Sequence, residues 1–258
     1  MNHSIKNVTD TYKNPNINNY RFFAKMPVSE LEMLGIYMYH NFLFKAPEDM
    51  ADRMKKNTYE KEEINMILST IPHKLFKDLN VIEIGGCLGV VSVISNHLLV
   101  NKKNHVIIEA NPELLPILEF NKKINNSCFS IEHCIISKND NFTKFKVYDK
   151  VVAGSAHRQD NGESNERIYN VKNKTLESLV NKYCTFDCII IDIEGGELDF
   201  LIENTDYIRN QVKYIIIEIH EFLMYKGFEQ KCLEILQNNC NMNLINKNGS
   251  SFLFEKKS

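Results

Sequence analysis

The 258-residue sequence predicts a doubly wound α/β fold built around a mostly parallel sheet. From residue 79 onward, short runs rich in Ile and Val alternate with segments of helical character. These apolar runs are continuous along the chain, which is typical of strands that helices cover on both faces. The chain is long enough for one substantial α/β domain with an appendage.

Residues 1–72 are expected to form a tail and a helical cap in front of the main domain. Residues 1–20 are polar, rich in Asn and without the apolar core of a secretory signal. A Ser followed three residues later by a Glu predicts the start of a helix over 29–44. A second helix is expected over 47–71, between a proline suited to a first turn and a proline that ends it.

Residues 73–258 are expected to form the main domain, in which strands and helices alternate. The predicted strands lie at 79–84, 105–110, 130–137, 186–193 and 213–220, and the helices at 88–100, 112–124, 196–203 and 227–239. A hairpin around Asn248 and Gly249 closes the chain. The polar region 142–174 is either a lid or a surface excursion, and its His157 and Arg158 are either acceptor-binding or ordinary surface residues.

Composition excludes several classes of partner. A formal net charge of -2 gives no general attraction to nucleic acid or anionic lipid, and no apolar run approaches the roughly 18 residues that span a bilayer. The seven cysteines form no CxxC pair, and several lie in strand-like runs, which favours reduced thiols and a cytoplasmic location. We therefore expect no nucleic-acid partner and no membrane span, while a homo-oligomer stays open.

A glycine-rich turn follows the first predicted strand. Residues 81–89 read VIEIGGCLG, so a buried strand passes through Gly85, Gly86, Cys87 and Gly89 into a helix. Small residues let the backbone approach a ligand, and the start of a helix offers unpaired N–H groups. The turn therefore predicts a site for a nucleoside cofactor.

An acidic residue ends the second predicted strand, about twenty residues beyond the turn. At that position Glu109 can accept hydrogen bonds from both ribose hydroxyls of a bound nucleoside. Asn111 and Pro112 follow it and predict the cap and first turn of the next helix.

The dinucleotide fingerprint Gly-x-Gly-x-x-Gly does not fit the turn. It fails in both alignments, because Ile84 or Cys87 stands where a glycine is needed. A pyrophosphate is therefore a poor fit, and Glu83 at the strand end would repel it. The same carboxylate favours a cation, such as the amino group or sulfonium of S-adenosylmethionine.

These residues, with later segments, resemble the FkbM-like family of S-adenosylmethionine-dependent methyltransferases. Segment 83–89 is similar to the family's Asp-x-Gly-Ala-Asn-x-Gly turn, with Cys87 in the usual Asn place. Segment 109–112 resembles its second motif, and Thr-Leu-Glu at 175–177 its Thr-Leu-Asp helix. The candidate cofactor-binding residues are Glu83, Gly85, Gly86, Cys87, Gly89, Glu109, Asn111 and Asp192.

The most specific resemblance lies at 186–197, which reads FDCIIIDIEGGE. It is similar to the family's Asp-x-x-Lys-x-Asp-Val-Glu-Gly-x-Glu block, with Ile190 where a lysine often stands, and IEIH at 217–220 resembles its next strand. The resemblance covers about residues 75–255. It implies a Rossmann-like class I methyltransferase fold with a C-terminal antiparallel hairpin, preceded here by N-terminal helices. It also implies that the substrates are hydroxyl groups of sugars, glycans or natural products.

The carboxyl ends of parallel strands meet at one edge of a sheet, where open α/β sheets bind ligands. The residues expected at or near that edge are Glu83, Glu109, Asp192, Glu194, Glu218 and His220. We expect His220 and Glu194 to act as bases that remove the acceptor proton, and Asp192 to orient cofactor or acceptor. In an alternative, these three residues hold a divalent metal that lowers the pKa of the hydroxyl. No metal-specific spacing is present, so no metal ligand is assigned.

The leading hypothesis is an S-adenosylmethionine-dependent O-methyltransferase acting on a sugar, glycan or related small metabolite. An alternative from another class is a non-catalytic subunit of methyltransferase fold that binds a partner. A nicotinamide-dependent oxidoreductase is a further alternative, against which the broken fingerprint counts. The presence of Glu83 and Glu109 and of the pair Asp192 and Glu194 weighs against a loss of ligand binding.

Overall fold

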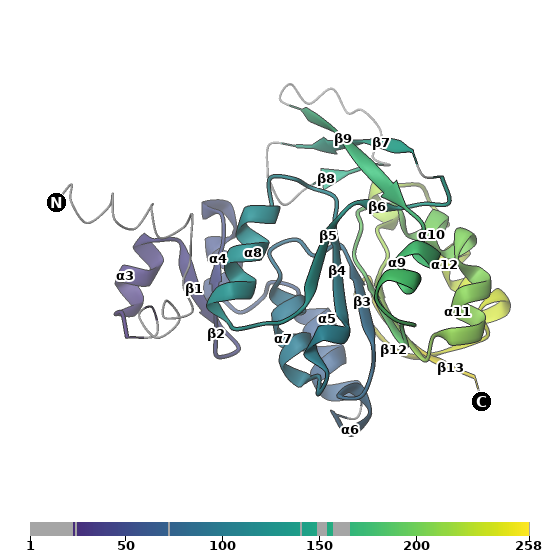
Figure 1. The fold of residues 1–258 in the computed structure, drawn as a ribbon, viewed down its shortest axis with the longest axis horizontal. Coiled ribbons are helices and arrows are strands. Elements are labelled where there is room, and N and C mark those ends of the chain that lie inside the picture. The colour runs from purple at the N-terminus through teal and green to yellow at the C-terminus, as the bar shows by residue number, and fades with distance from the viewer. Residues whose placement is uncertain are drawn as a thin grey trace.

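A seven-stranded sheet forms the centre of the protein in the computed structural model, which describes residues 23, 25–71, 73–139, 141–148, 154–156 and 166–257 (Figure 1). Its strand order is β12-β13-β11-β10-β3-β4-β5. The strands are β3 (Val81–Ile84), β4 (His105–Glu109), β5 (Ser130–His133), β10 (Cys188–Ile191), β11 (Tyr214–Glu218), β12 (Met242–Asn248) and β13 (Ser251–Lys256). Strands β5, β4, β3, β10 and β11 run parallel, and β13 and β12 pair antiparallel at one edge.

The central strands are buried along their whole length because both faces of the sheet are covered. Every residue of β3, β4 and β10 is buried. Alternate side chains of β10 enter different cores, with Ile190 in one apolar cluster and Ile189 and Ile191 in the other. The continuous Ile and Val runs of the sequence therefore mark strands that lie between two layers.

Helices cover both faces of the large sheet. The helices are α7 (Val90–Leu98), α8 (Leu115–Ile124), α9 (Leu176–Lys182), α10 (Glu197–Glu203), α11 (Thr205–Gln211) and α12 (Phe228–Glu234). Buried residues of α9 to α12 share one cluster, whereas α7, α8 and the N-terminal segment share the other. No helix in the described part of the chain is long and apolar enough to cross a membrane.

The N-terminal segment departs from its prediction. The helix expected over 29–44 is wrong beyond α3 (Val28–Met33), because β1 (Ile36–Tyr39) and β2 (Phe42–Lys45) form an antiparallel hairpin. Gly35 has a φ of 66°, and His40 and Asn41 in the turn also have positive φ. A two-residue turn of this kind joins strands well, and the flanking aromatic residues favour strands.

The helix expected over 47–71 is also interrupted. The structure has a 3-10 turn at Glu48–Met50, then α4 (Ala51–Lys55), α5 (Lys61–Asn65) and a π-helical turn at Met66–Thr70. Asn57 and Glu60 between the two helices have positive φ, which a helix does not allow. Met54 and Ile64 belong to the same core cluster as the central strands. The segment thus packs on the sheet, and α6 (His73–Phe76) leads from it into β3.

A second, smaller sheet lies at the end of the large sheet where β5 leads into β6 (Figure 1). It contains β6 (Ile135–Ile136), β9 (Arg167–Lys174), β7 (Phe142–Val147) and β8 (Gly154–Ser155), in that order. Region 142–174 therefore includes strands paired with one another. His157 and Arg158 lie outside the described residues.

Candidate active site

A cavity of about 410 Å³ opens at the carboxyl ends of β3, β4, β10 and β11. It is also lined by the small sheet, through Ile136 and Phe145, and by the N-terminal segment, through Tyr59. Its volume falls within the range of about 300–1,000 Å³ that is typical of small-molecule sites. The cavity occupies the place where open α/β sheets bind their ligands.

The glycine turn after β3 packs tightly against its neighbours. A Cβ atom on Gly85, whose φ is 98°, would lie 1.7 Å from the carbonyl oxygen of Asp192. A Cβ on Gly86 would lie 2.3 Å from Cγ2 of Ile107. Gly85 therefore lets the end of β10 approach the turn, which places Asp192 beside it. Gly85 and Cys87 line the cavity, whereas Gly86 and Gly89 serve the packing behind it.

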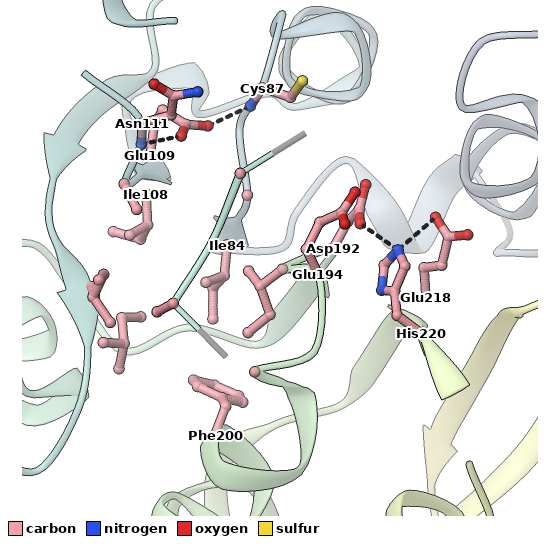
Figure 2. A pocket seen from close by; sticks show the side chains of 18 of the residues that line it. Ile84, Cys87, Ile108, Glu109, Asn111, Asp192, Glu194, Phe200, Glu218 and His220 are labelled. Carbon is pink, nitrogen blue, oxygen red and sulfur yellow. Dashed lines mark hydrogen bonds and ion pairs between the residues drawn. The ribbon is translucent and has the colours of Figure 1, made fainter. Parts of the chain in front are cut away.

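Glu109 joins the ends of the first two strands. One carboxylate oxygen accepts the N–H of Cys87 at 2.7 Å, and the other accepts the N–H of Asn111 at 2.6 Å (Figure 2). Burial raises the pKa of Glu109 to about 7, against the opposing effect of these backbone hydrogen bonds. Each oxygen keeps a second lone pair. The carboxylate can therefore still accept two hydroxyl groups from a ligand in the cavity.

The structure places Glu83 away from the cavity. Its carboxylate accepts a hydrogen bond from Ser92 Oγ of α7 at 2.7 Å, and its other oxygen lies 3.5 Å from Nε2 of His105. Side chains alternate along a strand, so Glu83 points to the layer of α7 while Ile84 lines the cavity. We therefore do not retain Glu83 as a direct contact of the cofactor.

Asn111 lines the cavity beside Glu109. Its side-chain oxygen accepts the N–H of Glu113 at 3.0 Å, which fixes a turn before α8. The sequence predicts a helix starting at Pro112, but α8 begins at Leu115, with a proline in its first turn.

Asp192, Glu218 and His220 converge at the ends of β10 and β11 (Figure 2). Nε2 of His220 lies 3.5 Å from Oδ1 of Asp192 and 3.9 Å from Oε2 of Glu218. Their potential ligand atoms all lie within 4.8 Å of one another. The sequence places all three residues at one edge of the sheet, and the structure brings their side chains together there.

Glu197 orients this histidine. Its Oε1 lies 2.6 Å from Nδ1 of His220 and also accepts the N–H of Gly195 at 3.1 Å. Burial opposes a charged His220, but the hydrogen bond to Glu197 and the charges of Asp192 and Glu218 outweigh it and raise the pKa of the imidazole to about 10. From sequence, Glu197 follows directly after Gly195 and Gly196 in the first turn of a helix, where it complements the helix dipole, and no local signal points to His220.

Glu194 lies in the loop after β10, two residues beyond Asp192, and lines the cavity. Its φ of 48° is unusual for a residue with a side chain, and its carbonyl oxygen accepts a hydrogen bond from Ser155 Oγ at 2.7 Å. This contact ties the loop after β10 to the small sheet. The loop therefore holds Glu194 in the cavity wall.

The N-terminal segment contributes residues that the sequence does not point to. The hydroxyl of Tyr59 lies 3.1 Å from Sγ of Cys87, which places the segment directly over the glycine turn. Glu60 and Glu63 also line the cavity. These contacts join residues 28 or more positions apart, so no local pattern reveals them.

The cavity is strongly acidic. Nine carboxylates belong to its described lining residues, whereas the cationic side chains there are Arg53 and His220. The carboxylates are Glu60, Glu62, Glu63, Glu109, Asp192, Glu194, Asp199, Glu203 and Glu218. Burial raises the pKa of Glu60, Glu63, Glu109 and Asp192, so not all nine carboxyl groups are ionised in the empty cavity. The lining still favours cations and hydroxyl groups over phosphate groups.

A parallel sheet with a glycine turn after one strand and an acidic residue ending the next defines an α/β protein that binds a nucleoside cofactor. Residues 83–244 match the model of the methyltransferase FkbM domain. The chain therefore belongs to the FkbM family of S-adenosylmethionine-dependent methyltransferases. This membership confirms the family resemblance, the enzyme class and the cofactor that the sequence implies.

Solved structures with a similar fold include three methyltransferases. An FkbM methyltransferase from Methylobacillus flagellatus is 11% identical with a TM-score of 0.45, over 81% of this chain and 55% of that chain. An O-methyltransferase from Bacillus cereus in complex with SAH is 12% identical with a TM-score of 0.44, over 75% and 79%. A precorrin-6y C5,15-methyltransferase from Geobacter metallireducens is 14% identical with a TM-score of 0.44, over 79% and 88%. A comparison with curated proteins finds no significant sequence match.

Proposed function

We propose that the protein transfers the methyl group of S-adenosylmethionine to a hydroxyl oxygen of a sugar, glycan or related small metabolite. The observation that carries this proposal is the acidic cavity between Glu109 and the cluster of Asp192 and His220. One end offers hydrogen-bond acceptors for a ribose, and the other offers carboxylates beside the place where the methyl group would be transferred.

The residues at the Glu109 end of the cavity fit the cofactor. We assign the ribose hydroxyls to Glu109, whose two oxygens each use one lone pair on a backbone N–H. Gly85 and Cys87 form the wall next to it, where the backbone can approach the nucleoside. The positive sulfonium and ammonium groups would be stabilised by the surrounding carboxylates.

The same lining disfavours a dinucleotide. A pyrophosphate needs N–H donors and cations, but the described lining supplies nine carboxylates against Arg53 and His220. This electrostatic balance supports the adenosyl cofactor over a nicotinamide dinucleotide. It also supports a hydroxyl-rich acceptor without phosphate, because carboxylates accept hydrogen bonds from hydroxyl groups.

Methyl transfer places two demands on the protein. The acceptor oxygen must lie in line with the methyl carbon at about 3–3.5 Å, and its proton must be removed. We assign proton removal to Glu194, because Nε2 of His220 already faces the carboxylates of Asp192 and Glu218. Asp192, next to the glycine turn, orients the acceptor against the cofactor.

Calorimetry and turnover test this function together. We expect the protein to bind S-adenosylmethionine and S-adenosylhomocysteine but not NAD, and to release S-adenosylhomocysteine with one or more members of a panel of sugar acceptors. Cofactor binding without turnover on any hydroxyl acceptor would favour the non-catalytic binding subunit. Binding of NAD instead of S-adenosylmethionine would refute the assignment of the cavity.

A further inference from the structure

Three potential metal ligands meet at one point of the cavity wall. The atoms are Oδ1 of Asp192, Oε2 of Glu218 and Nε2 of His220. Nε2 lies 3.5 Å from Oδ1 and 3.9 Å from Oε2, and no two of the three residues' ligand atoms are more than 4.8 Å apart. Adjacent ligands of an octahedral ion with bonds near 2.1 Å stand roughly 3 Å apart. Shifts of an ångström or less would therefore let all three reach one ion.

The imidazole is oriented for this role. His220 is 4% exposed, and its Nδ1 is held by the fully buried Glu197 at 2.6 Å, so Nε2 is the nitrogen that faces Asp192 and Glu218 (Figure 2). Nε2 thus lies 3.5 Å and 3.9 Å from two carboxylate oxygens, a position that a proton or a metal ion can occupy. A divalent ion bound there would replace the proton on Nε2. A carboxylate bound to the remote nitrogen is also the usual support of a metal-binding histidine.

The two carboxylates are held as well. Ser250 Oγ donates to Oε1 of Glu218 at 2.7 Å, which leaves Oε2 as the oxygen nearer to His220. The N–H of Asp192 donates to the carbonyl oxygen of Ile84 at 2.9 Å, which fixes the start of its loop. Each ligand thus has a separate anchor in the sheet or in the loops next to it.

We propose that Asp192, Glu218 and His220 bind one divalent transition-metal ion of the Mn²⁺ type. One imidazole and two carboxylates suit such an ion better than Ca²⁺, which prefers oxygen ligands alone. The set differs from the alternative considered from the sequence, because Glu218 takes the place of Glu194. All three side chains line the cavity, so the coordination positions of the ion that they do not fill are open to an acceptor hydroxyl there. The ion site itself does not depend on the cofactor half of the cavity at Glu109.

Mn²⁺ binding is measured by the loss of the electron paramagnetic resonance signal of the free ion. The full chain, freed of metal with a chelator, is expected to bind one Mn²⁺. Asp192→Asn and Glu218→Gln are expected to weaken that binding at least tenfold, and each variant is checked by its melting temperature. Glu203→Gln is the matched control, because Glu203 lines the same cavity outside the cluster and should bind Mn²⁺ as the unmodified protein does.

Direct ligation is read from the unmodified protein, so it does not depend on a variant that folds. The electron spin echo of the Mn²⁺ complex should show coupling to one imidazole nitrogen, and His220→Asn should abolish it. The proposal would be overturned if the unmodified protein bound no Mn²⁺ or showed no nitrogen coupling. It would also be overturned if Glu218→Gln bound Mn²⁺ as tightly as the unmodified protein. Affinity for S-adenosylmethionine, measured in the presence of the chelator, tests the proposed function separately.

Discussion

The backbone N–H of Cys87 donates to Oε2 of Glu109 at 2.7 Å, so the turn after β3 and the end of β4 are joined by a carboxylate that lines the cavity. The same carboxylate accepts the N–H of Asn111. A protein group that fixes both loops and still keeps free lone pairs is well placed to hold a ribose between them.

Replacing this carboxylate should weaken cofactor binding. We expect Glu109→Ala to reduce affinity for S-adenosylmethionine at least tenfold, about 1.4 kcal/mol, because two hydrogen bonds to the ribose are lost. Calorimetry on the folded variant measures the change. A folded Glu109→Ala protein with unchanged affinity would remove Glu109 from the cofactor site.

The raised pKa of Glu109 predicts how binding depends on pH. Because burial raises this pKa to about 7, the Glu109 carboxyl group of the ligand-free protein is mostly protonated at pH 6 and mostly ionised at pH 8. A ligand whose hydroxyls donate to the carboxylate prefers the ionised form, so affinity should fall as pH drops. We expect S-adenosylhomocysteine to bind roughly tenfold more weakly at pH 6 than at pH 8. Glu109→Gln should lose that difference, and an equal pH dependence in both proteins would contradict the assignment.

Proton removal by Glu194 predicts a selective loss of turnover. Glu194→Gln keeps the size of the side chain but cannot take a proton, so kcat should fall by about 10²–10⁴. Affinity for S-adenosylmethionine should change little, since the ribose contacts lie at Glu109. Stopped assays for S-adenosylhomocysteine release give kcat, and full activity in Glu194→Gln would exclude this residue as the base.

Glu197 acts on the site through His220, and we treat it as a positioning residue. Glu197→Ala should lower turnover roughly 10- to 100-fold, while the cofactor affinity stays within about twofold. Glu197→Gln can still accept from Nδ1 and from the N–H of Gly195, so it should restore most of the loss. Nitrogen NMR of the imidazole reports the ring tautomer. Equal turnover in the Ala and Gln variants at matched melting temperature would leave Glu197 a purely structural role.

A stability prediction follows from Glu132, outside the cavity. Burial would raise its pKa, but hydrogen bonds from Lys174, Lys182 and Tyr183 outweigh it and lower the pKa to about 2. The ionised form is thus favoured in the folded protein, and its contribution is present above about pH 4.5 and lost as pH falls toward 2. Glu132→Gln should lower the free energy of unfolding by about 1–3 kcal/mol at pH 7 and by less at pH 3.

Urea denaturation at the two pH values measures this difference. Glu119→Gln is the control, because Glu119 is partly exposed and lies 3.9 Å from Lys122 in a surface pair that contributes little. A loss in Glu132→Gln no larger than the loss in Glu119→Gln would contradict the prediction.

The parallel part of the fold could be predicted from sequence because its signal is local. Strands such as β4 and β10 are continuous apolar runs, and Glu109 and Asp192 follow directly from where those runs end. Glu83 shows the limit of this reasoning. A strand that is covered on both faces has no polar and apolar alternation to show which side chains point to which layer. The orientation of the Glu83 side chain toward α7 could therefore not be predicted.

The N-terminal segment shows two further limits. His40 and Asn41 between aromatic runs do signal a hairpin, but the Ser and Glu spacing before them favoured a helix. The approach of Tyr59 to Cys87 is a contact made by the folded chain, and no spacing of residues encodes it. Glu197 likewise gains its role from His220, which follows it by 23 residues.

The most direct test is a crystal structure of the protein with S-adenosylhomocysteine bound. We predict that the nucleoside lies in the cavity beside the glycine turn, with its ribose hydroxyls at about 2.6–3.0 Å from the carboxylate oxygens of Glu109. Electron density for the nucleoside elsewhere, or a ribose turned away from Glu109, would contradict the assignment of this cavity.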